Sequence, residues 1–531
     1  MIGPVMLAHV SQRLQEAKGN HLPFGGVGVV LVGDAAQLPP VCPPLSLFQG
    51  LVHQQVILPT DKLPPKTKYY TYDVDTPAHA GSRLFSKFAL LELTEQMRAA
   101  EDPVHTAFVN RFRETGRTEH VTQEVLDHIR VLCRADVEAD PEWAFAVHVV
   151  TTNRERDAIN LAQALRFARV HNAPLVRWRL PLVGSSAARM SHEDVATLYE
   201  EHDVDLFQYF VVGAPGYITD NIGSRIGLAN GTFISMHSLT FNHDGTALQR
   251  RQAVAAEQAI AATAGGELVT VDVAPLSVNV RVPKSAAEVA SWPPELTMVP
   301  GAIVVPLLAD PRKQEELKLR GTFVGRTVTV QPHSVDLGFA ISVWKCQGRT
   351  MSKVILSLNQ RPAGPHFDFA ALFVAFSRVR KGADMRRLPV QSAQSLQYLL
   401  LLKPKMELLC WREGFDDSGV WSAAAARGAY TRLQLQPVGS PTNSGRFAAR
   451  CRPHNAPLLF GTPATPTASA DYDCMCSSAS VGFPSQQDLE AMADNELTSD
   501  RPVPIRNFGN TCWLGATVNV SYLVRWVLWL V

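Results

Sequence analysis

The sequence predicts an α/β protein with more than one domain. Early in the chain, a helical pattern over residues 4–17 precedes an apolar strand over 27–32. Farther along, the apolar strand 147–150 leads into the helical pattern 154–170, and such alternation is typical of α/β units. With 531 residues, the chain is long enough for roughly two to four domains, and its composition of 46% hydrophobic and 19% charged residues is ordinary for a globular protein.

The strand over 27–32 ends in Gly33 and Asp34, and these are soon followed by Gln37 and two prolines. Strands of open α/β sheets carry ligand groups at their carboxyl ends. A neutral glutamine there can contact a terminal phosphate or orient an attacking water without adding negative charge. Residues 1–75 are therefore expected to form the end of an α/β domain with a nucleotide-sensing edge.

The rest of the chain divides into further expected segments. A second α/β unit is expected over 76–200 and 326–414, and a small β-rich insertion over 201–325, where helical periodicity fades. Ala, Ser, Pro, Thr and Gly dominate 425–500, which predicts a disordered linker, and a short helical fragment is expected over 502–531. The β-like runs within the insertion are 232–239, 268–273 and 302–307.

Charge and cysteine content limit the classes of partner. The formal net charge is +1, so a nucleic-acid binder of this composition needs local basic strips. Eight scattered cysteines without paired CxxC spacing favour a reduced, intracellular protein. No secretory signal is visible, and the apolar tail 518–531 is interrupted by Arg525 and shorter than the roughly 20 residues of a membrane span. An unfinished core helix is favoured there over a tail anchor, and no membrane partner is expected.

A candidate phosphate contact ends the apolar run 90–98. The planar guanidinium of Arg98 could fork onto phosphate oxygens and stabilise charge that develops during phosphoryl transfer. The alternative is a surface arginine that pairs with Glu95 or Glu101.

The segment 338–350, followed by the apolar strand 354–358, is the most specific pattern in the chain, and it predicts a helix, a polar turn and a strand. Gly348 allows close approach of a phosphate backbone, and Trp344 could stack on a base. Alternatively, Trp344 is a core residue and the neighbouring lysine is merely solvated. The polar side chains of the turn are Lys345, Gln347 and Thr350.

A second arginine follows the apolar run 369–376. Such a run holds Arg378 on a rigid element, from which it could reach the γ-phosphate of a nucleotide on a neighbouring domain. The alternative is an arginine that satisfies the end of a helix and its dipole.

In their order and spacing, these elements resemble the Pif-type and RecD-type DNA helicases of superfamily one, over roughly residues 1–390. The family's GDxxQLPP strand end matches the segment with Asp34 and Gln37, and its HKSQGxT helix matches 344–350, where Trp344 and Cys346 depart from the usual His and Ser. Four further segments match: 93–98 (LTEQMR-like), Thr152-Asn153 with Asn160 following (TN), 230–232 (NGT) and 374–379 (VALSRV).

The resemblance implies two RecA-like P-loop domains, the first truncated, with ATP and Mg²⁺ between them and single-stranded or forked DNA across their tops. The family's small β-barrel would correspond to the insertion at 201–325. The family moves along DNA in the 5′ to 3′ direction, in the nucleus or mitochondrion. The implied nucleotide contacts are Asp34, Gln37, Arg98, Gln347 and Arg378. The implied DNA contacts are Asn153, Trp344, Lys345, Gln347 and Thr350.

Two parts of such a motor are missing from the sequence. It contains no GxxxxGK[ST] loop to hold the phosphates and no Asp-Glu pair for magnesium. In the family this pair stands a few residues before a segment like 1–4, so the chain is expected to start just after its metal site. We expect no ATP hydrolysis by this polypeptide alone. Whether the truncation is biological or an artefact of gene prediction stays open.

A different chemistry is predicted at 505–516, which resembles the cysteine box of ubiquitin-specific proteases. Cys512 would be the nucleophile at a helix N-terminus, with Asn510 assisting the oxyanion. Gly515 and Asn519 depart from the family's residues, and no histidine follows the cysteine to serve as its base. The alternative for Cys512 is a buried structural cysteine. For the whole chain, two alternatives stay open: a deubiquitinase fragment that binds ubiquitin, and a non-catalytic single-stranded DNA binder.

Overall fold

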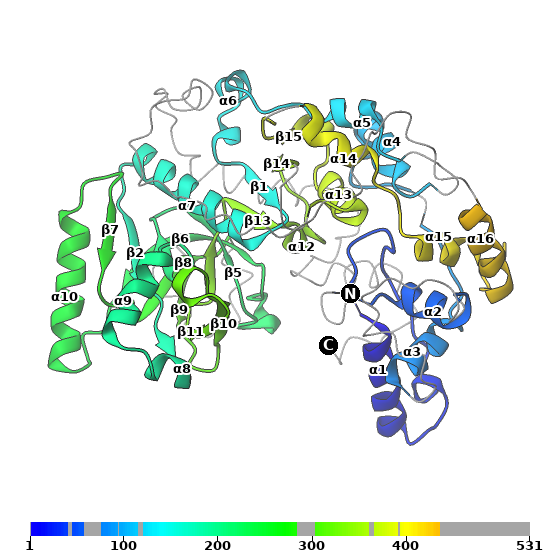
Figure 1. Ribbon diagram of the computed structural model, residues 1–531, viewed down its shortest axis with the longest axis horizontal. Coiled ribbons are helices and arrows are strands. Elements are labelled where there is room, and N and C mark those ends of the chain that lie inside the picture. The colour runs from blue at the N-terminus through cyan, green and yellow to red at the C-terminus, as the bar shows by residue number, and fades with distance from the viewer. Residues whose placement is uncertain are drawn as a thin grey trace. The chain divides into compact units, whose positions relative to one another are not determined.

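The computed structural model of the chain describes residues 2–40, 45–57, 76–93, 95–114, 120–283, 303–359, 366–390 and 393–435 (Figure 1). The described residues fall into two compact units. The helical unit contains residues up to Val29, Gly33–Glu95 and the residues from Lys403 onward. The sheet unit contains Val30–Val32 and Gln96–Leu402.

Close helix packing builds the helical unit. Gly81 lies so near the first turn of α1 that a Cβ atom there would come within 1.8 Å of the Pro4 carbonyl oxygen, so a larger residue would separate α1 from α3. The ring of Trp411 contacts Phe48 and Phe85, with ring centroids 5.9 and 6.1 Å away, which joins helices distant in sequence. The helices are α1 (Pro4–Lys18), α2 (Leu47–Gln55), α3 (Pro77–Phe85), α15 (Met406–Glu413) and α16 (Ala423–Leu435).

The structure differs from two predictions, one early in the chain and one at its later end. Residues 27–32 form no strand and pair with none in the described part of the chain, and Val30 is 63% exposed. A parallel strand needs neighbours on the same sheet, so an apolar run alone does not make one. Residues 425–435, predicted to begin the disordered linker, lie in α16, where Ala426, Ala429 and Tyr430 are buried. Residues 436–500 lie outside the described residues.

A four-stranded parallel sheet in the order β13-β1-β14-β15 confirms the α/β fold class. The predicted strand at 147–150 is β1 (Val147–Val150), and the predicted helix is α7 (Asn153–Val170), which begins where the Thr152 hydroxyl accepts a hydrogen bond from the Glu155 amide. The other strands of the sheet are β13 (Ala340–Ser342), β14 (Val354–Leu356) and β15 (Met385–Arg387). Further helices of the unit are α4 (Pro103–Arg111), α5 (Gln123–His128), α6 (Arg134–Ala139), α12 (Val343–Cys346), α13 (Phe369–Phe376) and α14 (Gln397–Leu400).

The segment 338–350 was predicted to begin as a helix, and this is wrong. Residues 340–342 form β13, and only the four residues of α12 are helical. The β13 side chains are buried because this short strand lies beside β1 in the sheet. An apolar run of this length fits a buried strand as well as a helix.

A β-rich region lies beside the parallel sheet and extends beyond the predicted limits of 201–325 (Figure 1). Its three sheets have the orders β12-β5-β6-β8-β9, β10-β11-β3 and β4-β2-β7. The strands are β2 (Leu175–Arg179), β3 (Leu182–Val183), β4 (Phe207–Phe210), β5 (Pro215–Ile218), β6 (Phe233–Thr240), β7 (Leu268–Val271), β8 (Ser277–Arg281), β9 (Val304–Leu308), β10 (Glu315–Lys318), β11 (Thr327–Val330) and β12 (Val335–Leu337). The helices are α8 (Gly184–Ala188), α9 (His192–Glu201) and α10 (Ala247–Ala262).

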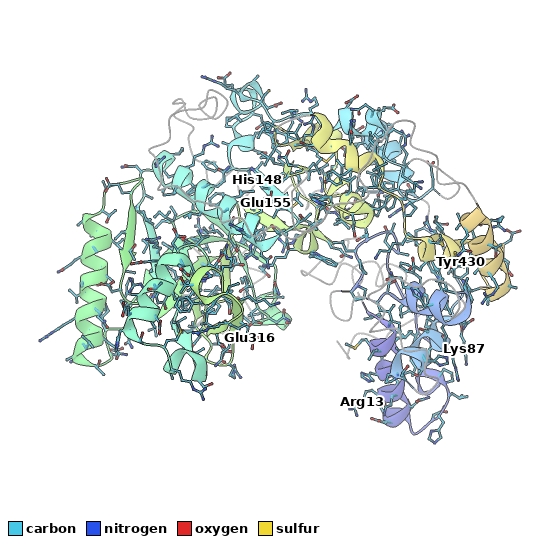
Figure 2. The ribbon with its side chains drawn as sticks, in the orientation of Figure 1. Arg13, Lys87, His148, Glu155, Glu316 and Tyr430 are labelled. Atoms are coloured by element: carbon cyan, nitrogen blue, oxygen red, sulfur yellow. The ribbon has the colours of Figure 1, made fainter. Side chains whose placement is uncertain are left out.

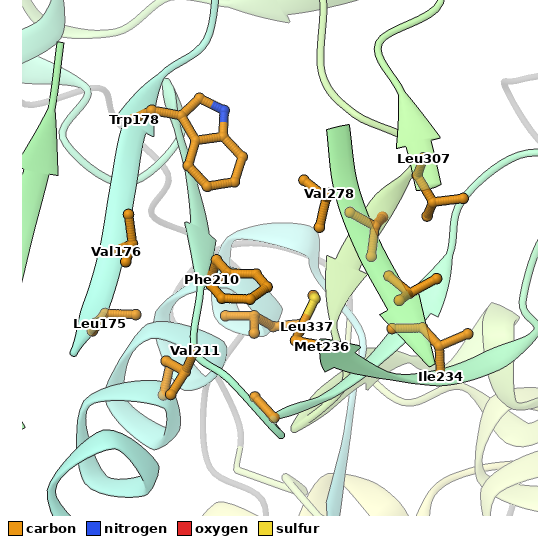
Figure 3. Close-up of a cluster of buried hydrophobic side chains, with 14 of the residues drawn as sticks. Leu175, Val176, Trp178, Phe210, Val211, Ile234, Met236, Val278, Leu307 and Leu337 are labelled. Atoms are coloured by element: carbon orange, nitrogen blue, oxygen red, sulfur yellow. The ribbon is translucent and has the colours of Figure 1, made fainter. Parts of the chain in front are cut away.

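The core of this region lies between two of its sheets. Side chains of β2 and β4, among them Trp178 and Phe210, face those of β6, β8 and β9, including Met236 and Val278 (Figure 3). Burial of these large apolar groups supplies most of the stabilisation of such a layered arrangement. No helix among the described residues is long and apolar enough to cross a membrane.

Two buried histidines make the stability of the sheet unit depend on pH. Burial lowers the pKa of His105 on α4 and of His148 on β1 (Figure 2) from 6.5 to about 4. Because the folded-state pKa lies below the unfolded value, stability is complete above pH 6.5 and is lost as the pH falls towards 4. Urea unfolding should show a loss on the order of 1–2 kcal/mol per histidine between about pH 7.5 and about pH 5.

The control for this experiment is His192→Gln, which removes an exposed imidazole and should leave the pH dependence unchanged. Equal free energies of unfolding at the two pH values would contradict the prediction.

Candidate functional site

The candidate site is centred on the turn Cys346–Thr350, which follows α12 in the sheet unit. Gly348 has a φ of +83°, a left-handed conformation that glycine adopts without the strain of a Cβ atom. The Arg349 amide donates to the Cys346 carbonyl oxygen at 3.1 Å and closes the turn. This tight turn exposes Thr350 beside its half-buried neighbours Arg349 and Gln347.

Arg98 joins this turn to the end of α13. Its Nε donates to the Thr350 Oγ1 at 3.0 Å, and its Nη1 donates to the Ser377 carbonyl oxygen at 2.7 Å. The segment 93–98 and the two later segments, although more than 250 positions away in the chain, therefore meet in one place. These contacts occupy the guanidinium with protein atoms from both segments.

Arg378 is a buried structural element of the site. Its side chain is only 1% exposed, and its Nε donates to the Val374 carbonyl oxygen at 2.6 Å. Its Nη1 lies 3.4 and 3.3 Å from the carbonyl oxygens of Cys346 and Arg349. The contact with Val374 in the last turn of α13 is the helix-end role that the sequence left open, and in this structure the guanidinium faces the protein interior. Its contact with a γ-phosphate stays a prediction.

Arg349, which the sequence analysis did not select, connects the turn to the predicted NGT turn. Its Nη2 donates to the Gly231 carbonyl oxygen at 2.5 Å, and its guanidinium lies 4.5 Å from the centre of the Tyr217 ring. Burial raises the pKa of Tyr217 to about 12. Arg349 occupies the variable position of the HKSQGxT pattern, so nothing in a single sequence marks it as a structural contact.

The predicted DNA contacts lie around this turn and differ in exposure. Trp344 is 39% exposed and so is not a buried core residue, and its stacking on a base stays a prediction. The Nζ of Lys345 lies 3.5 Å from the Asp336 Oδ2. Asn153 is exposed at the first turn of α7, whereas Asn160 is buried and bonds the backbone of Ala340, with Oδ1 accepting from the amide at 2.8 Å.

Cys346 stands where the resembling family has serine, and its environment explains its chemistry. The thiol is buried, and burial raises its pKa to about 12. Its Sγ lies 3.5 Å from the Ser342 carbonyl oxygen. A neutral, enclosed thiol of this kind packs as a small apolar group and is a poor nucleophile.

Asp34 and Gln37 lie together in the helical unit. The Asp34 side chain accepts from the Ala36 amide at 3.0 Å and from the Gln37 Nε2 at 3.3 Å. The strand end predicted from the sequence is therefore a local turn held by its own acid. Arg98 and Arg378 belong to the sheet unit.

The residues that the structure describes do not supply the usual main ligands of a magnesium–ATP complex. Among the described residues, no group of three His, Cys, Asp or Glu side chains could hold a metal ion. The full sequence also lacks a GxxxxGK[ST] loop. The candidate protease residues Asn510 and Cys512 lie outside the described residues.

No protein-family model and no curated protein matches the chain. Among solved structures, the chain is similar to Bacteroides Pif1 bound to single-stranded DNA, with 18% identity, 79% of this chain and 74% of that chain covered, and a TM-score of 0.45. It is also similar to a Bacteroides Pif1 complex with ADP-AlF3 and single-stranded DNA, with 18% identity, 78% of this chain and 72% of that chain covered, and a TM-score of 0.43. Pif1 helicase from Candida albicans matches at 15% identity, over 75% of this chain and 74% of that chain, with a TM-score of 0.39.

Replacement of Arg378 should destabilise the protein much more than replacement of Arg98. Arg378→Ala removes the buried hydrogen bonds to Val374, Cys346 and Arg349 and creates a cavity, so a loss of about 3–5 kcal/mol is expected. Arg98→Ala removes a half-buried side chain and should cost about 1 kcal/mol. The free energy of unfolding in urea measures both, and equal losses would contradict the structural role of Arg378.

Proposed function

We propose that this chain is part of a Pif-type DNA helicase and that its sheet unit carries the single-stranded DNA contacts of the motor. The observation that carries the proposal is the meeting of separate motif segments at the turn Cys346–Thr350. Three arginines make these contacts, and each lies in a segment that the family resemblance selects. Arg98 donates to Thr350, Arg349 donates to Gly231, and Arg378 donates to the Cys346 and Arg349 carbonyl oxygens. Unrelated surface residues would have no reason to converge in this way.

The exposed groups around the turn suit a single strand. Trp344 offers a ring on which any base can stack, and such stacking is tolerant of sequence. Lys345 and Thr350 can contact the phosphates, and Asn153 adds an amide at the start of α7. The bond from Arg98 to Thr350 then gives a direct link between a candidate nucleotide contact and a candidate DNA contact.

ATP-dependent unwinding in the 5′ to 3′ direction is the activity that the whole motor would have under this proposal. The chain supplies Asp34 and Gln37 for nucleotide sensing but lacks the main phosphate and magnesium ligands. A non-catalytic single-stranded DNA binder would keep the DNA contacts without nucleotide dependence. Because this chain lacks the main nucleotide ligands, a longer chain that contains them is needed to separate the two by binding with and without ATP and Mg²⁺.

We expect the full 531-residue chain to bind fluorescent oligothymidylate and Trp344→Ala to weaken this binding about ten-fold, because it removes one stacking contact. Fluorescence anisotropy at fixed salt measures the affinity. Val324→Ala, which truncates another exposed apolar side chain, is the control and should have no effect. If the wild-type chain fails to bind, or if the two variants bind equally, the proposal is wrong.

The chain alone is expected to release no phosphate from ATP, with or without oligothymidylate. Without a phosphate-binding loop, most of the electrostatic stabilisation of phosphoryl transfer is absent. A phosphate-release assay with Mg²⁺ tests this, with Gln37→Ala as the matched variant. DNA-stimulated phosphate release that Gln37→Ala abolishes would contradict the expectation.

A further inference from the structure

A carboxylate lies beside the candidate DNA-contacting lysine. The Asp336 Oδ2 is 3.5 Å from the Lys345 Nζ and 3.9 Å from the Arg156 Nη1. The three residues come from β12, α12 and α7, so the fold and not local sequence brings them together. The sequence analysis selected only Lys345 of this group.

Neighbouring contacts hold the carboxylate in place. Asp336 is a strand residue, paired with Tyr217 across the antiparallel β12–β5 ladder. Arg156 is anchored by Asp157, whose Oδ1 accepts from Nε at 2.8 Å and from Nη2 at 2.7 Å. The backbone of Asp336 is therefore fixed in the ladder, and its carboxylate lies between Arg156 and Lys345.

The charged side chains around Asp336 and Lys345, called here the Asp336 patch, form pairs of opposite charge, so the loss of one charge changes the net charge of the patch. Besides Asp336 and Lys345, the patch contains the pair of Arg156 with Asp157 and a pair in which the Lys313 Nζ lies 4.0 Å from the Glu315 Oε1. A patch without excess positive charge attracts phosphates only weakly. Neutralisation of a single carboxylate would make it cationic.

We propose that Asp336 is a positioning residue that occupies Lys345 in the free protein and competes with DNA phosphates for it. This inference rests on the proposed function. The contact is longer than a strong charge-assisted hydrogen bond, and the side chains of Lys345 and Asp336 are 27% and 38% exposed. Pairs this exposed are weak, so a phosphate can displace the carboxylate. The displacement lowers DNA affinity below that of an unpaired lysine.

Asp336→Asn tests the proposal in the full chain with fluorescent oligothymidylate. Binding should become roughly three-fold tighter, because Lys345 no longer has to leave a carboxylate. Asp336→Ser, a second neutral variant, should behave alike.

Two controls separate this effect from a general change of charge. Asp310→Asn removes an equal charge from another ion pair of the sheet unit, that with Arg312 at 2.9 Å, and should leave binding unchanged. In a Lys345→Ala background, Asp336→Asn should give no gain. Thermal unfolding of each variant shows that it is folded.

The outcomes distinguish this inference from the proposed function. If the wild-type chain binds but the Asp336 variants bind equally or more weakly, the inference is wrong and the proposed function stands. The same holds if Asp336→Asn raises the DNA affinity as much in the Lys345→Ala background as in the wild-type chain. If neither the wild-type chain nor any variant binds the oligothymidylate, the inference and the proposed function are both wrong.

Discussion

The buried guanidinium of Arg378 is the contact on which the candidate site depends. A cation out of water is costly unless its donors are satisfied, and here backbone carbonyl oxygens of α13 and of the turn Cys346–Thr350 accept from it. Two distant segments must therefore fold against each other for the charge to be tolerated. Once the turn is fixed, Thr350 faces Arg98, and Arg349 reaches Gly231. The contacts of Arg98 and Arg349 thus share the turn to which this buried charge is bonded.

Periodicity in the sequence predicted the elements that carry their own signal. The helical pattern over 154–170 predicted α7, and the apolar run 147–150 predicted β1. The apolar run 369–376 was predicted only as a rigid element, and it forms the helix α13. The capping box formed by Thr246 and Gln249 marks the start of α10, a signal that was present in the sequence but not used. Residues 27–32 show the limit, because pairing depends on neighbours that the run itself does not specify.

The site was predictable in its residue types but not in its contacts. The segments around Arg98, Lys345 and Arg378 could be selected because their order along the chain matches a family. Which of the arginines is buried could not be predicted, since each follows an apolar run. Arg349 shows the same limit, because its partners Gly231 and Tyr217 lie more than 100 positions away in the chain.

The arginines of the site contribute more to architecture than to phosphate attraction in this structure. Arg349 and Arg378 donate to backbone carbonyl oxygens, and Arg98 donates to a carbonyl oxygen and to the Thr350 hydroxyl. The carboxylate of Asp336 lies beside Lys345. With a net charge of +1 over the whole chain, there is also no long-range field to compensate. Attraction for nucleic acid must then come largely from a contact that needs no charge, and the exposed ring of Trp344 provides one, because every base has a face that stacks.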